Sequence, residues 1–67
     1  MNKPEQVLRI EDILNDLLLD WVIYDNDDYI ILTVDGKIES YARNFIYEYA
    51  DKIKETGNRT KIFIGKG

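Results

Sequence analysis

Residues 21–39 read WVIYDNDDYIILTVDGKIE, and β-branched and aromatic residues dominate the two apolar runs within them. Such runs are typical of strands, in which successive side chains point to opposite faces of a sheet. We therefore expect a strand over residues 21–24, a polar turn over 25–28 and a second strand over 29–34. Asp35 and Gly36 predict a two-residue hairpin turn, which makes residues 37–39 a short third strand.

Helical periodicity flanks this region on both sides. On the N-terminal side a helix is predicted from the turn at Pro4 to about Asp20, with an apolar stripe made of Val7, Ile10, Leu14, Leu17 and Trp21. On the C-terminal side a second helix is predicted from Ser40 to about Thr56, ending at Gly57, with an apolar face made of Ala42, Phe45, Ile46, Tyr49 and Ile53. Residues 60–64 then form a final strand.

These elements predict a single domain over residues 1–67 of the α+β class. We expect a two-layer sandwich in αβββαβ order, with two amphipathic helices and a small, mainly antiparallel sheet of three or four strands. A chain this short buries only about 60% of its unfolded surface. Because it has no Cys and no His to supply a disulfide or a structural zinc site, a homodimer is a reasonable expectation.

The strand periodicity assigns side chains to two faces of the sheet. If Ile30, Leu32, Val34, Ile62 and Ile64 face inward, then Tyr29, Ile31, Thr33 and Phe63 face outward, joined by Val22 or Tyr24. Helices on one face only would leave this outward set exposed, whereas one helix on each face would bury it. On the first alternative, Tyr24, Tyr29, Ile31 and Phe63 are candidate partner-binding residues, since large exposed apolar patches mark interaction sites.

The absence of His and Cys excludes imidazole and thiol chemistry. Carboxylates, Lys, Tyr and hydroxyls remain, but a small two-layer domain has little depth for a cleft. We expect no enzyme, no catalytic residue, no cofactor and no metal. The cluster Asp25-Asn26-Asp27-Asp28 fails the EF-hand pattern, since the sixth position from Asp25 is Ile30 instead of Gly. It is typical of a turn.

The net charge of −4 and the pI near 4.6 oppose attraction to phosphate backbones and anionic lipid. We expect no direct nucleic-acid contact and no membrane contact. No apolar run reaches 18 residues and Met1 to Gln6 lacks a secretion pattern, so a cytoplasmic protein is expected. The acids Asp25, Asp27 and Asp28 add a candidate acidic rim that could dock a basic surface, including a nucleic-acid groove whose phosphates they imitate.

The segment Lys61-Ile62-Phe63-Ile64-Gly65 resembles the RNP2 strand of RNA-recognition motifs. In that family an aromatic on this strand stacks a base, but the strand opens the domain and has a second motif as its partner. Here it closes the chain, and no Lys/Arg-Gly-Phe-Gly-Phe motif accompanies it.

In size, acidity and lack of His and Cys, the chain resembles the small accessory proteins of phages and mobile elements that inactivate host factors. The sequence predicts a non-enzymatic protein-binding module, an inhibitor or adaptor acting on a host protein whose identity is unknown. Two alternatives stay open, namely a nucleic-acid-mimicking decoy in a basic groove of a nuclease or polymerase, and a homodimeric structural subunit.

Overall fold

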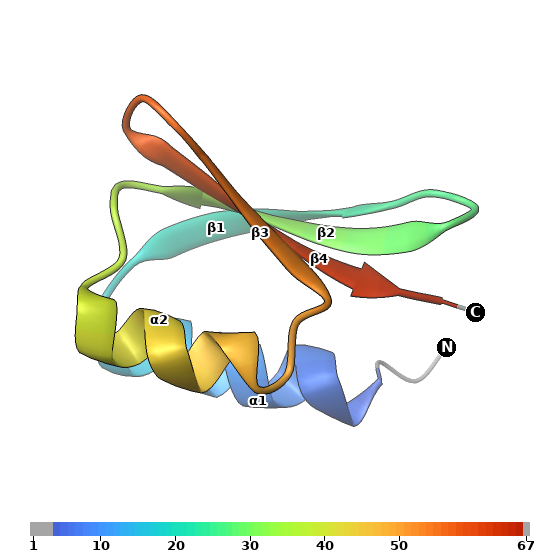
Figure 1. Ribbon diagram of the computed structural model, residues 1–67, viewed down its shortest axis with the longest axis horizontal. Coiled ribbons are helices and arrows are strands. Elements are labelled where there is room, and N and C mark those ends of the chain that lie inside the picture. The colour runs from blue at the N-terminus through green and yellow to red at the C-terminus, as the bar shows by residue number, and fades with distance from the viewer. Residues whose placement is uncertain (1–3, 67) are drawn as a thin grey trace.

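The computed structural model describes residues 4–66. Figure 1 shows a twisted sheet with helices along one side. The elements in chain order are α1 (Glu5–Asp16), β1 (Asp20–Asp25), β2 (Tyr29–Asp35), α2 (Ser40–Tyr47), β3 (Lys52–Thr56) and β4 (Arg59–Gly65). The predicted α+β fold class is confirmed, with two helices and one four-stranded antiparallel sheet.

The strands lie in the order β1-β2-β4-β3, so the two central strands are β2 and β4. Two hairpins, β1-β2 and β3-β4, are joined through the antiparallel β2-β4 pair, in which Leu32 lies opposite Ile62. Every neighbouring pair is antiparallel. The order of elements is thus αββαββ, with the third strand after the second helix.

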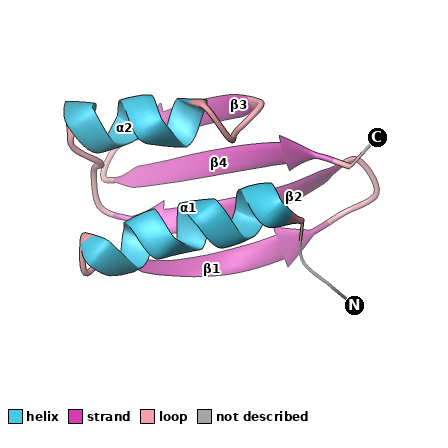
Figure 2. Cartoon of the chain, turned by 90° about the horizontal axis from the view of Figure 1, so that it is seen from below, coloured by secondary structure: helices cyan, strands magenta, loops and turns pink. Residues whose placement is uncertain are grey.

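Both helices cover the same face of the sheet, which selects the first of the two alternatives left open by periodicity (Figures 1 and 2). The core lies between these two layers. Its buried apolar residues are Val7, Ile10, Leu14, Leu32, Val34, Ile38, Ala42, Ile46, Ile62 and Ile64. The opposite face of the sheet has no described element over it.

The predicted strand at residues 37–39 is wrong. A type I′ turn needs positive φ at both central residues, and of Asp35 and Gly36 only Gly36 has it, at 117°. The Gly36 N–H donates to the Asn58 carbonyl at 2.6 Å, and the Thr60 hydroxyl donates to the Gly36 carbonyl at 3.2 Å. Gly36 therefore ties the end of β2 to the β3-β4 turn, and the chain continues into α2.

The second helix is also shorter than predicted, because α2 ends at Tyr47 and residues 52–56 form β3. Ile53 fits both periods, since it lies seven residues after Ile46 and also alternates with Lys52 and Lys54. Pairing with β4 satisfies the backbone groups of this segment, with Ile53 opposite Ile62. Gly57, at φ 58°, belongs to the β3-β4 turn instead of a helix end.

The first helix ends at Asp16, about four residues earlier than predicted. The Leu19 N–H donates to the Leu14 carbonyl and the Leu18 N–H to the Asn15 carbonyl. With Leu18 in the left-handed region, this is the arrangement that commonly closes a helix before a change of direction. Trp21 consequently lies in β1 and not on the helix stripe.

Candidate functional site: the outer face of the sheet

The outer face is the side of the sheet turned away from both helices. Alternation along each strand defines its members, because Leu32, Val34, Ile62 and Ile64 point into the core. The outer face consists of Asp20, Val22 and Tyr24 on β1, Tyr29, Ile31, Thr33 and Asp35 on β2, Arg59, Lys61 and Phe63 on β4, and Lys52, Lys54 and Thr56 on β3.

The structure brings the four predicted aromatic and aliphatic residues together. Tyr24, Ile31 and Phe63 form one row across β1, β2 and β4, since each lies directly opposite the next. Tyr29 packs edge-on against Phe63, with ring centroids 5.6 Å apart and an interplanar angle of 84°. Tyr24 is the most open of the four, with 61% of its surface accessible. The predicted residues thus form one continuous patch.

Two further neighbours complete this apolar patch. Val22, which precedes Tyr24 on the same face of β1, is 55% exposed. The Lys52 ammonium lies 5.1 Å from the centre of the Phe63 ring, a favourable cation–π distance. One end of the outer face is therefore apolar and bordered by a cation.

The predicted acidic residues lie at the end of β1 and in the β1-β2 turn. Asp25 alternates with Tyr24, so its side chain is on the other side of β1, and it forms an ion pair with Lys66. Asp27 and Asp28 are exposed in the β1-β2 turn. Asn26 Oδ1 organises this turn by accepting hydrogen bonds from the N–H groups of Asp28 and Tyr29, at 2.9 and 2.7 Å. Among residues 4–66 no group of three or more potential metal-ligating side chains is found.

Sequence reasoning missed the basic half of the outer face. The predicted helix from Ser40 to about Thr56 contains Lys52 and Lys54, but on β3 they lie beside Lys61 and Arg59 of β4. Lys54 and Lys61 are directly opposite each other. Within the described chain, Lys54, Arg59 and Lys61 form no ion pair. The alternation Lys-Ile-Lys at residues 52–54 was the signal that could have revealed this group.

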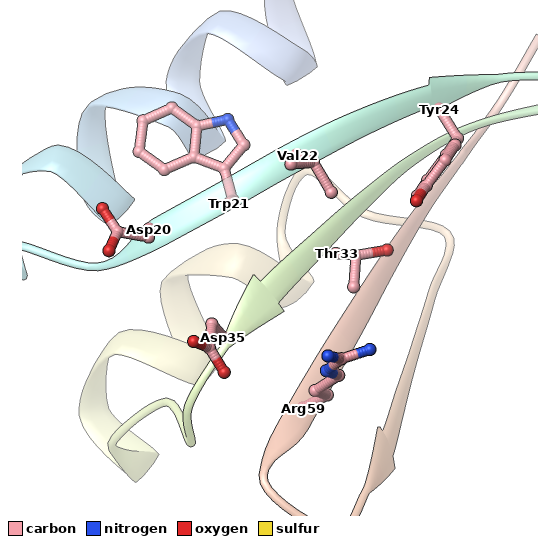
Figure 3. Close-up of a pocket in the computed structure, with 7 residues that line it drawn as sticks. All are labelled: Asp20, Trp21, Val22, Tyr24, Thr33, Asp35 and Arg59. Atoms are coloured by element: carbon pink, nitrogen blue, oxygen red, sulfur yellow. The ribbon is translucent and has the colours of Figure 1, made fainter.

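A shallow hollow of about 350 Å³ lies on the outer face and shares Val22 and Tyr24 with the apolar patch (Figure 3). Its lining residues are Asp20, Trp21, Val22, Tyr24, Thr33, Asp35 and Arg59. Asp35 lies between Asp20 and Arg59 in one row across three strands. Thr33 Oγ1 is buried at this site without a hydrogen-bond partner in the described chain.

Among the described residues, no helix is long and apolar enough to cross a membrane. Comparisons with known protein families, with curated proteins and with solved structures found no match to this chain.

Proposed function

We propose that this chain is a non-enzymatic protein-binding module, a cytoplasmic inhibitor or adaptor that contacts its partner through the outer face of the sheet. The observation that carries the proposal is the row Tyr24–Ile31–Phe63, with Val22 beside it, on a sheet face that neither helix covers. Tyr and other stiff side chains of this kind supply much of the binding energy at interfaces.

Burial of the exposed apolar patch against a partner would stabilise a complex. Apolar surface removed from water contributes about 25 cal/mol per Å². On the outer face, that surface is concentrated at one end and surrounded by charged residues, which is the usual arrangement of an apolar centre with a polar rim. Tyr24 and Val22 also lie at an edge strand, where a partner can approach without displacing any described element.

The test compares single substitutions at two aromatic residues of similar exposure, Tyr24 at 61% and Phe45 at 57%. Tyr24→Glu places a carboxylate in the apolar patch, whereas Phe45→Glu places one on α2. Affinity-tagged wild-type protein is used to capture partners from cells, and captured proteins are quantified by mass spectrometry. A partner that uses the outer face should be lost at least tenfold with Tyr24→Glu and retained with Phe45→Glu.

Both variants are first checked for a native amide NMR spectrum, since both positions are exposed and neither lies in the core. Retention of every captured protein by a folded Tyr24→Glu variant contradicts the proposal. Selective loss with Phe45→Glu would place the interface on the helices instead.

The decoy alternative has less geometric support. A nucleic-acid mimic needs acids spread over one surface like phosphates on a strand. The acids Asp25, Asp27 and Asp28 are gathered at one turn, and the outer face carries four cations against two acids, Asp20 and Asp35. These positions favour a contact made by the outer face over one made by the acidic turn.

A further inference from the structure

We propose that the basic half of the outer face, defined as Lys54, Arg59 and Lys61 with Lys52 at its border, binds an extended acidic segment of a partner protein. This inference rests on the proposed function and names the chemistry of the partner. The chain carries a net charge of −4, yet these four cations gather on two neighbouring strands of one face.

Lys54 and Lys61 are two like charges on neighbouring strands. Like charges directly opposite each other on neighbouring strands destabilise a sheet. The two lysines lie opposite each other, and neither forms an ion pair within the described chain, so the fold itself gains nothing from this arrangement. An anionic group placed between the two ammonium groups would convert this repulsion into attraction.

The spacing of the basic side chains along β4 matches that of an extended polypeptide. Arg59, Lys61 and Phe63 are alternate residues of β4 on one face, which sets them about 6.8 Å apart along the strand. Alternate side chains of an extended polypeptide have the same spacing. A segment lying along β4 can therefore place two carboxylates near Arg59 and Lys61 and an apolar side chain near Phe63.

A single-stranded nucleic acid fits these observations less well. Base stacking needs accessible aromatic faces, but the Phe63 ring has the Lys52 ammonium 5.1 Å from its centre and the Tyr29 ring against it. A phosphate chain that crossed the sheet would also meet Asp20 and Asp35, whereas a segment that follows β4 meets only Asp35, opposite Arg59.

A second copy of the chain also leaves the lysines uncompensated. If two outer faces pack about a two-fold axis parallel to the strands, β3 lies over β1 of the copy, and Lys54 meets Val22 while Lys61 meets Thr33. If the axis crosses the strands, β3 and β4 each lie over themselves and cations face cations. An external acidic segment is the occupant that neutralises Lys54 and Lys61.

The test is an NMR titration of ¹⁵N-labelled protein. The probe is the capped peptide SLTETETLS, which has the same pattern in both directions, and its matched control SLTQTQTLS carries no charge. A thymidine octanucleotide is the third ligand. We expect the acidic peptide to shift the amide signals of residues 52–54 and 59–63, with at least tenfold weaker binding of the neutral peptide.

Two double variants separate a local contact from net charge. Lys54→Gln with Lys61→Gln should weaken binding of the acidic peptide about tenfold, as expected for the loss of two exposed charge contacts. Arg9→Gln with Lys37→Gln removes the same charge from α1 and from the loop after β2, and should change binding less than twofold. The spectra themselves report whether each variant is folded.

Equal binding of the two peptides, or no shift with either, overturns this inference. Tighter binding of the octanucleotide overturns it in favour of nucleic acid, and outer-face shifts that depend on protein concentration alone overturn it in favour of a second copy. If Tyr24→Glu still abolishes partner capture in any of these cases, the proposed function stands and only the acidic segment is refuted.

Discussion

Leu18 has a φ of 58°, and it is the single non-glycine residue with positive φ among residues 4–66. Leucine pays a steric cost of about 1–2 kcal/mol in this conformation, because its Cβ approaches the following carbonyl oxygen. Leu18 is 92% exposed, so burial of its side chain contributes almost nothing to stability. The chain tolerates this residue because the left-handed position lets α1 close and β1 begin two residues later.

Leu18→Gly should therefore stabilise the protein by about 1 kcal/mol, since glycine adopts this conformation without the Cβ clash. The loss of chain entropy that glycine brings offsets part of the gain. Urea denaturation followed by circular dichroism measures the change in the free energy of unfolding.

The matched control is Leu8→Gly, which makes the same replacement at a half-exposed leucine inside α1. It should destabilise by about 1 kcal/mol, the usual cost of glycine in a helix interior. If both glycine variants are destabilised alike, Leu18 does not carry the backbone strain assigned to it.

At the scale of elements, the charged side chains of β3 contact different neighbours on the two faces of the sheet. Glu55 pairs with Arg43 of α2 at 3.0 Å, and Arg43 also donates to the Ile38 carbonyl. These contacts attach α2 to the sheet edge. Lys54, next to Glu55 but on the outer face, meets only the like charge of Lys61 on the strand beside it.

Lys54→Glu should raise the free energy of unfolding by roughly 0.5 kcal/mol, because a repulsive cross-strand pair becomes an attractive one. Lys37→Glu makes the same change in net charge in the loop after β2, without a cross-strand partner. Denaturation midpoints of the two variants are compared at low salt, and the difference should shrink as salt rises. Equal midpoints would show that the lysine pair exerts no repulsion.

The edge strand β1 carries an acidic residue at each end, which opposes pairing with β1 of a second copy. Asp20 and Asp25 stand at its two ends, so an antiparallel β1-β1 pair centred on the strand would set Asp20 of one chain opposite Asp25 of the other. Opposed like charges disfavour that arrangement.

At the scale of the whole molecule, charge is unevenly distributed over the surface. The acids of α1 and of the β1-β2 turn are on other elements than the basic half of the outer face, and Asp35 is the acid directly opposite Arg59. Under the proposed function, an acidic segment of the partner would be attracted to the basic half. Such charge complementarity contributes to specificity and orientation more than to affinity.

Replacing Asp25, Asp27 and Asp28 together by Asn should leave partner capture through the outer face within about twofold of wild type, since these side chains are outside the basic half. The same captured proteins are quantified for the triple variant and for Tyr24→Glu. Abolition of capture by the triple variant, with capture by Tyr24→Glu intact, would favour the acidic decoy.

Local periodicity was sufficient for much of the fold and of the candidate site. The apolar stripe of α1 at Val7, Ile10 and Leu14, the strand content of β1, β2 and β4, and the shared outward face of Tyr29 and Ile31 all follow from residues close in sequence. Each depends on the geometry of a single helix or strand, which repeats every 3.6 or 2 residues.

Only tertiary contacts determine where β3 lies, how the chain continues after β2 and which face of the sheet the helices cover. The sheet edge beside β4 drew residues 52–56 into a strand although Ile53 suited a helix, and the hydrogen bonds of Gly36 to the β3-β4 turn replaced a hairpin. The β3-β4 hairpin sets Lys54 opposite Lys61. Helix placement on one face, which leaves the Tyr24 row uncovered, depends on contacts between residues far apart in sequence. Those contacts arise from burial and backbone pairing across the whole chain, and no short window of sequence contains them.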